Sequence, residues 1–119
     1  MKASRGIKGK LDKLVGSFFR SRPCDFSLID STHKCKGRLE WCHIKTRKYL
    51  LLRWDFFNNL TLCSERHFYF TANPDEFIHW VDKYFPGRTE YLNKKMMELR
   101  TMKKSDLEEL YKNKKEELE

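Results

Sequence analysis

The order of apolar and polar positions predicts helices at both ends of the chain and a short hairpin near its middle. Apolar residues recur three or four positions apart over residues 7–21, which is typical of an amphipathic helix that ends before Pro23. Residues 38–44 and 58–63 have the composition of short strands. The segment between them, residues 45–57, is predicted as a long ordered connection, and residues 24–37 as a loop or irregular hairpin.

The second half of the chain reads as consecutive helices. A short helix is expected from Ser64 toward Thr71, and Asn73-Pro74-Asp75-Glu76 has the composition of a helix start. That helix should end at Pro86-Gly87, with another following from about Arg88. A second capping box, Ser105 to Glu108, is predicted to open the last helix. The pattern indicates one α+β domain over residues 1–119, with an amino-terminal helix (7–21), a central ββα unit (38–71) and carboxy-terminal helices (74–118).

Charge and cysteine usage restrict the partners and the compartment. The formal net charge of +8 favours a polyanion such as nucleic acid, although a merely basic, soluble surface is the alternative. The longest apolar stretch is far shorter than the roughly 20 residues of a membrane span, and the basic start lacks the apolar run of a secretory signal. We therefore expect a cytoplasmic protein with no membrane partner. Its four cysteines should be buried or bind metal rather than form disulfides.

Three polar residues of the central unit form a candidate catalytic set. His43 ends the first predicted strand, Asn58 begins the second, and His67 lies on the helix that follows Cys63. A hairpin that leads into a helix can bring these side chains together. Imidazole suits a general base near neutral pH, and phosphodiester hydrolysis also needs a cation on the phosphoryl oxygens. His43 fits the base, His67 a metal ligand and Asn58 an orienting group.

The segment HIKTRKYLLLRWDFFNNLTLC, with His67 behind it, resembles the core of His-Asn-His (HNH) endonucleases. It is especially similar to the NinG/Rap recombination endonucleases of phages, in the residues Cys42-His43-Ile44, Thr46-Arg47-Lys48-Tyr49, Leu52-Arg53-Trp54-Asp55 and Asn58. The resemblance implies a ββα-metal fold and hydrolysis of DNA with one divalent cation, Mg²⁺ or Mn²⁺, with Ni²⁺ or Zn²⁺ as alternatives. It also implies branched, Holliday-junction-like substrates in a bacterial or phage-infected cell. A nickase of ordinary duplex and a catalytically inactive DNA-binding module remain as alternatives.

The chain departs from that family at two places. HNH domains often bind a structural zinc through two CxxC pairs, which here read Cys24-x-x-Ser27 and Cys63-x-x-Arg66. Each pair has lost one ligand, so we expect no structural zinc and buried cysteines at 24, 35 and 63, with Cys35 or His33 as substitute ligands being the alternative. Cys42 stands where many HNH enzymes have an oxygen or nitrogen ligand. It is a candidate metal ligand beside His67, but a thiolate suits Mg²⁺ poorly, and Glu40 and Asp55 are the alternative sources of an oxygen ligand.

Basic residues in the connection are candidate contacts for DNA phosphates. They are Lys45, Arg47, Lys48 and Arg53. A solvated basic loop is the alternative, and phosphate contacts would in any case carry no sequence information. The charged last helix is expected to be solvated, although its apolar stripe leaves a homodimer open.

Overall fold

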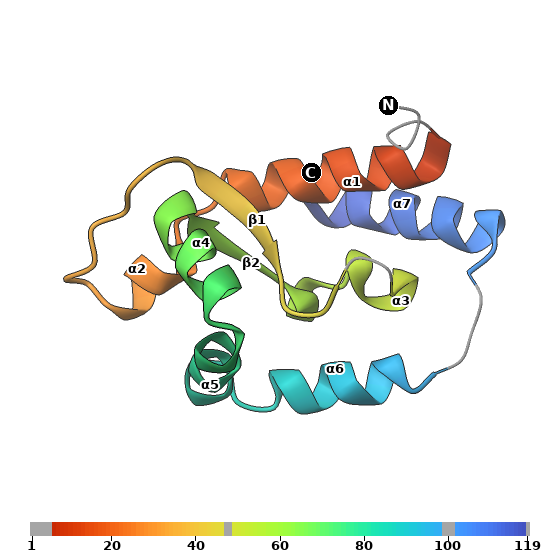
Figure 1. Cartoon of the computed structure of the whole chain (residues 1–119). Coiled ribbons are helices and arrows are strands. Elements are labelled where there is room, and N and C mark those ends of the chain that lie inside the picture. Colours follow the sequence, from red (N-terminus) through yellow and green to blue (C-terminus); the bar gives the residue numbers. More distant parts are fainter. Residues whose placement is uncertain (1–5, 47–48, 99–101, 119) are drawn as a thin grey trace.

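The computed structural model describes residues 6–46, 49–98 and 102–118 and has an α+β architecture, with helices around a two-stranded antiparallel sheet (Figure 1). In chain order the elements are α1 (Gly6–Arg20), α2 (Asp25–Ile29), β1 (Leu39–His43), α3 (Leu50–Arg53), the 3₁₀ turn η2 (Phe56–Asn58), β2 (Asn59–Cys63), α4 (Ser64–Ala72), α5 (Pro74–Tyr84), α6 (Arg88–Met96) and α7 (Lys104–Leu118).

The predicted helices and both predicted strands are present, and their ends differ by one or two residues from the expected bounds. Three segments differ from the prediction. Residues 24–37 contain the helix α2, and the connection contains α3 and η2. The last helix begins at Lys104, so Ser105 lies inside its first turn; the Asp106 carboxylate instead accepts a hydrogen bond from the Lys103 backbone N–H at 2.9 Å.

The sheet is one short hairpin in which β2 is the interior strand. Leu39 pairs with Cys63 and His43 with Asn59, so each strand contributes five residues to the ladder. All five residues of β2 are buried, whereas β1 has only Cys42 buried. A two-stranded hairpin alone is at best marginally stable in water, so the helices on its faces must supply most of the stabilisation.

Two apolar clusters cover the hairpin. One cluster joins the sheet to α2, α4 and α5, and it centres on Leu62, Phe70, Trp80 and Val81. The other lies under α1 and α7, which run side by side in Figure 1, and it centres on Leu11, Val15 and Trp54. The hairpin therefore lies between two helical layers, and this arrangement fixes which side chains of β1 remain accessible.

The polar interior of β2 finds partners outside the ladder. The Thr61 N–H donates to the Asp25 carboxylate at 2.8 Å, and its hydroxyl donates to the Phe19 carbonyl at 2.5 Å. Burial raises the pKa of Asp25, and the hydrogen bond from Thr61 only partly offsets this. These contacts satisfy buried groups that the sheet leaves unpaired, and they connect β2 to α2 and to the end of α1.

One ion pair connects α1 to the segment between the strands. The carboxylate of Asp12 accepts hydrogen bonds from the Arg53 guanidinium, including one from Nε at 3.1 Å, and one from the Trp54 indole N–H at 2.9 Å. Only 15% of the Arg53 side chain and 22% of the Asp12 side chain are exposed. The pair therefore holds two charges largely out of water.

We expect Asp12→Ala to lower the free energy of unfolding by about 3 kcal/mol, because it leaves the Arg53 charge and the Trp54 N–H without this partner. Urea denaturation followed by tryptophan fluorescence measures the change. Asp82→Ala, at an exposed position of α5, is the matched control and should change it by no more than about 0.5 kcal/mol. Equal effects of the two substitutions would contradict a stabilising role for Asp12.

Candidate active site and metal cluster

An open pocket of about 660 Å³ runs along β1. Side chains from both faces of the strand line it, which places it at the strand edge that β2 does not occupy. The lining residues are Arg20, Arg38, Leu39, Glu40, Trp41, His43 and His67. The structure thus brings two of the predicted catalytic residues, His43 and His67, into one pocket.

Glu40 and His67 form the pair at the centre of this pocket. The Glu40 Oε1 atom lies 2.8 Å from Nδ1 of His67, and the Arg38 guanidinium lies 3.5 Å from the other carboxylate oxygen. Both side chains of the pair are about 30% exposed, so a ligand from solvent can reach them. Of the two alternative oxygen ligands, Glu40 and Asp55, the contact with His67 favours Glu40.

Asp55, the other alternative, is committed elsewhere. One of its carboxylate oxygens accepts the Phe57 N–H at the start of η2, and the other accepts the Tyr91 hydroxyl at 2.6 Å. Burial and the neighbouring Asp55 carboxylate raise the pKa of Tyr91 to about 12. Asp55 therefore links η2 to α6 and does not line the pocket.

His43 lies at the end of β1, beside the aromatic ring of Trp41. The two ring centroids are 4.6 Å apart, and Trp41 is itself fixed by a 2.5 Å hydrogen bond from its indole N–H to the Asn59 side chain. Asn59 also donates to the Asp55 carbonyl at 2.5 Å, so the cross-strand partner of His43 anchors the connection as well. No motif in the sequence distinguished Asn59 from an ordinary strand residue.

Asn58 does not line the pocket but ties the connection together from inside. Its side-chain oxygen accepts the Lys45 N–H at 2.6 Å, and its amide nitrogen donates to the carbonyls of Lys45 and Leu52 at 3.2 and 3.0 Å. The residue is fully buried. These contacts hold the backbone that directly follows His43. They are a structural basis for the orienting role expected of Asn58.

Cys42 is not brought into the pocket. Its side chain faces the cluster under α5 and is only 3% exposed. Burial, together with the negative charges of Asp25 and Glu40, raises the pKa of its thiol to about 12. The thiol is therefore protonated at neutral pH and packs as a small apolar side chain rather than serving as a ligand.

The four predicted phosphate contacts have different outcomes. Arg53 is paired with Asp12, so its charge is already neutralised and we no longer expect it to bind DNA. Lys45 is held by Asn58 through its backbone, and its side chain is partly exposed. Arg47 and Lys48 lie outside the described residues.

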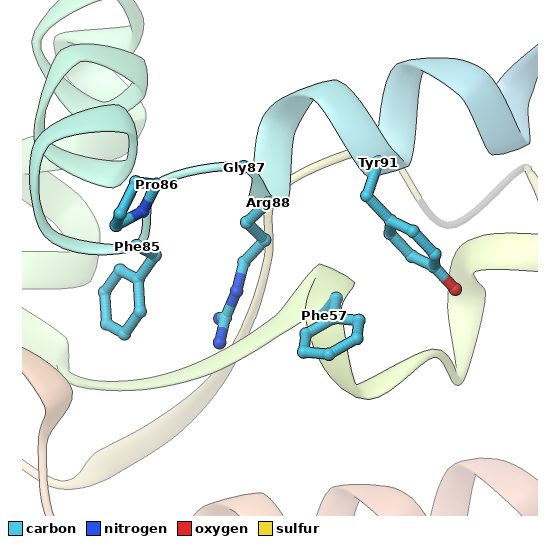
Figure 2. Close-up of a pocket in the computed structure, with 6 residues that line it drawn as sticks. All are labelled: Phe57, Phe85, Pro86, Gly87, Arg88 and Tyr91. Atoms are coloured by element: carbon cyan, nitrogen blue, oxygen red, sulfur yellow. The ribbon is translucent and has the colours of Figure 1, made fainter.

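Another hollow, of about 320 Å³, lies where α6 begins. Figure 2 shows the Arg88 side chain extending between the rings of Phe57 and Phe85, and its guanidinium lies 5.5 and 4.4 Å from their centroids. The remaining lining residues are Pro86, Gly87 and Tyr91. This hollow contains no histidine, cysteine or carboxylate, so it is not a candidate catalytic centre.

A second cluster of potential ligands lies at the opposite end of β2. One ligand atom from each of Cys24, His33, Cys35 and Cys63 falls within 4.8 Å of all the others. Three thiols and one imidazole at such distances could hold a metal ion. The two positions lost from the CxxC pairs are thus replaced by His33 and Cys35, so the reason for expecting no structural metal does not hold.

Hydrogen bonds lower the pKa of the Cys63 thiol. Burial alone would raise its pKa, but His33, the Arg66 N–H and the Lys36 N–H stabilise the thiolate and lower the pKa to about 7. Cys35 is exposed rather than buried as expected from the sequence, and desolvation together with the neighbouring Cys24 and Cys63 sulfurs raises the pKa of its thiol to about 11. A thiolate that accepts backbone N–H groups is poised to bind a cation.

The loop that carries Cys35 is shaped by a close contact with α4. Gly37 has φ +83°, and a Cβ there would lie 1.8 Å from the Ser64 hydroxyl, so only glycine fits. The carbonyls of Lys36 and Arg38 accept the N–H groups of Glu65 and Ser64, which begin α4. The loop therefore docks on the first turn of the helix that bears His67.

The lost ligand position at Arg66 has a packing reason. Its guanidinium lies over the Phe26 ring at 4.0 Å and the Tyr69 ring at 4.8 Å. Cation–π contacts of this kind hold α2 against α4. Arg66 stands where the HNH resemblance leads one to expect a cysteine, and the approach of His33 and Cys35 to Cys63 depends on the path of the loop.

Comparisons with known proteins gave no match, whether to a family model, a curated protein or a solved structure. Within the described residues, no helix has both the length and the apolar character needed to cross a membrane.

We expect Asn58→Ala to lower the free energy of unfolding by about 3 kcal/mol, because two carbonyls and one N–H lose their buried partner. Asn58→Asp should also destabilise, since a carboxylate oxygen would face the carbonyls of Lys45 and Leu52. Urea denaturation measures both changes. Asn93→Ala, exposed on α6, is the control, and a loss at Asn58 no larger than at Asn93 would argue against this role.

Proposed function

We propose that this protein is a metal-dependent DNA endonuclease in which His43 is the general base. The observation that carries the proposal is the juxtaposition of His43 with the Glu40–His67 pair in one open pocket. Imidazole exchanges protons near neutral pH, and a carboxylate–imidazole pair offers ligands for a cation. The net charge of +8 supports a polyanionic substrate.

Glu40 and His67 fit a divalent cation. Their nearest oxygen and nitrogen atoms are 2.8 Å apart and reachable from solvent, and Mg²⁺ commonly takes few protein ligands and completes its shell with water and substrate phosphate. When bound, such a cation supplies charge neutralisation at the phosphoryl and leaving oxygens. Mn²⁺ and Ni²⁺ suit the same oxygen and nitrogen ligands.

The chain's own residues then divide the remaining work. His43 accepts the proton of the attacking water, and the Trp41 ring beside it restricts the orientation of the imidazole. Asn58 fixes the backbone of Lys45, two residues after the base, so that His43 does not shift when substrate binds. Positioning of this kind requires that the residues around a base be rigid.

The resemblance to NinG/Rap endonucleases favours branched recombination intermediates as substrate, and nicking of ordinary duplex is the nearest enzymatic alternative. The inactive DNA-binding module remains as the alternative from another class. It would bind DNA with the same salt dependence but cleave neither plasmid nor four-way junctions with Mg²⁺, Mn²⁺ or Ni²⁺.

We expect His43→Ala to reduce cleavage of plasmid and junction DNA by about 10²–10⁴-fold while leaving DNA affinity and fold intact, because only proton transfer is lost. Cys42→Ala is the matched neighbour control and should retain cleavage, since Cys42 is buried away from the pocket. Gel assays of nicking, with circular dichroism as the check on folding, measure both. Near-wild-type cleavage by His43→Ala would remove the mechanism.

We further propose that the ion in the Cys24–His33–Cys35–Cys63 cluster is zinc in a structural role. Three sulfurs and one nitrogen would supply the four protein ligands that zinc prefers in structural sites, which would leave no ligand position for substrate. The ion would join the loop after α2 to the β2–α4 junction. It would thereby support the helix that carries His67.

Protein purified without added metal should contain about one zinc per chain by elemental analysis. His33→Ala and Cys35→Ser should lower both the zinc content and the melting temperature, because each removes one of four ligands. Cys42→Ala removes a cysteine outside the cluster and should keep the zinc. Wild-type protein with far less than one zinc, and unaffected by chelators, would contradict the assignment.

A further inference from the structure

The guanidinium of Arg20 is held beside the candidate base by contacts that neither its sequence position nor the HNH resemblance predicts. Arg20 is the last residue of α1 and lines the same pocket as His43. Its side chain folds back over Gly16, one turn earlier, where a Cβ would lie 2.8 Å from Nη1 and 3.1 Å from Nη2. The absence of a side chain at Gly16 therefore leaves room for this conformation.

The Trp41 ring lies under the same guanidinium. The Arg20 Cζ atom lies 5.8 Å from the Trp41 ring centroid, and the imidazole of His43 also lies beside that ring. Because the Trp41 indole is anchored on Asn59, Arg20 and His43 both lie against a ring that is itself fixed. The positive charge is thus positioned at the pocket rather than free to move over the surface.

The charge of Arg20 is also uncompensated. Among the ion pairs of residues 6–46, 49–98 and 102–118, none involves Arg20. Arg53 by contrast is bound to Asp12, and the carboxylate of Glu40 is shared between His67 and Arg38. Among the described residues that line the pocket, Arg20 is therefore the arginine without a carboxylate partner, and its guanidinium remains available to a ligand.

We propose that Arg20 binds a backbone phosphate of the DNA that occupies this pocket, an inference that rests on the proposed function. A guanidinium presents two parallel N–H donors that match the oxygens of a phosphate, which a lysine cannot reproduce. The contact would hold the strand against His43 and would act on substrate binding, without taking part in proton transfer.

The test uses Arg20→Ala and Arg20→Lys, with Arg22→Ala as the matched control. Arg22 is two residues away, lies over the Phe18 ring and does not line the pocket. Binding of a duplex is measured by fluorescence anisotropy against salt concentration in the His43→Ala background, where no cleavage interferes. Arg20→Ala should flatten the plot of log K against log salt by about one unit, and Arg22→Ala should leave it unchanged.

Cleavage assays in the wild-type background complete the test. We expect Arg20→Ala to raise KM about tenfold with a smaller change in kcat, and Arg20→Lys to keep the salt slope but recover only part of the KM. Equal effects of Arg20→Ala and Arg22→Ala, or an unchanged slope, would overturn the proposal even if His43→Ala abolishes cleavage. If the wild-type protein cleaves no DNA, the proposed function fails, while the binding slope still decides whether Arg20 contacts phosphate.

Discussion

The burial of β2 on both faces is the constraint on which the rest of the structure depends. A five-residue strand with one pairing partner cannot persist in water, so β2 must be enclosed by helices from both ends of the chain. Its two polar interior residues, Asn59 and Thr61, are then buried and require specific partners. Trp41, Asp25 and the end of α1 supply them, so the interior of one strand determines where three other elements dock.

The two ends of this strand position the two candidate sites. At its start, Asn58 and Asn59 hold the connection and the tryptophan beside His43. At its end, Cys63 belongs to the metal cluster and directly precedes α4, whose second turn begins near His67. An ion at Cys63 would therefore stiffen the junction from which His67 reaches Glu40. Loss of that ion should loosen the pocket along β1 without removing any of its residues.

The sequence predicts the elements well but the site only in part. Periodicity and cap residues locate α1, both strands and α4 to α6, because each is a local property of consecutive residues. The spacing of His43 and His67 along the hairpin and the helix after it correctly predicts that they come together in one pocket, whereas Asn58 is buried beside it. His33 and Cys35 stand only as an alternative in the sequence, since they reach Cys63 through the course of a loop closed by Gly37. The sequence likewise gives no reason to treat Arg53 differently from the other basic residues. Only its contact with Asp12 distinguishes it from Arg20 as a phosphate ligand.

The two candidate sites differ in the ligands they offer. This difference gives the burial of Cys42 a role that its position in the motif does not suggest. The cluster offers three sulfurs, which select soft or borderline ions, whereas the pocket offers an oxygen and a nitrogen, which suit harder ones. A thiolate facing Glu40 and His67 would draw zinc into the pocket and compete with Mg²⁺ or Mn²⁺. Instead, the Cys42 side chain lies in the core, and its burial keeps the thiol protonated. Two ions of different character would thus be sorted by ligand type within one short chain, because Cys42 packs in the core although it shares a strand face with Glu40.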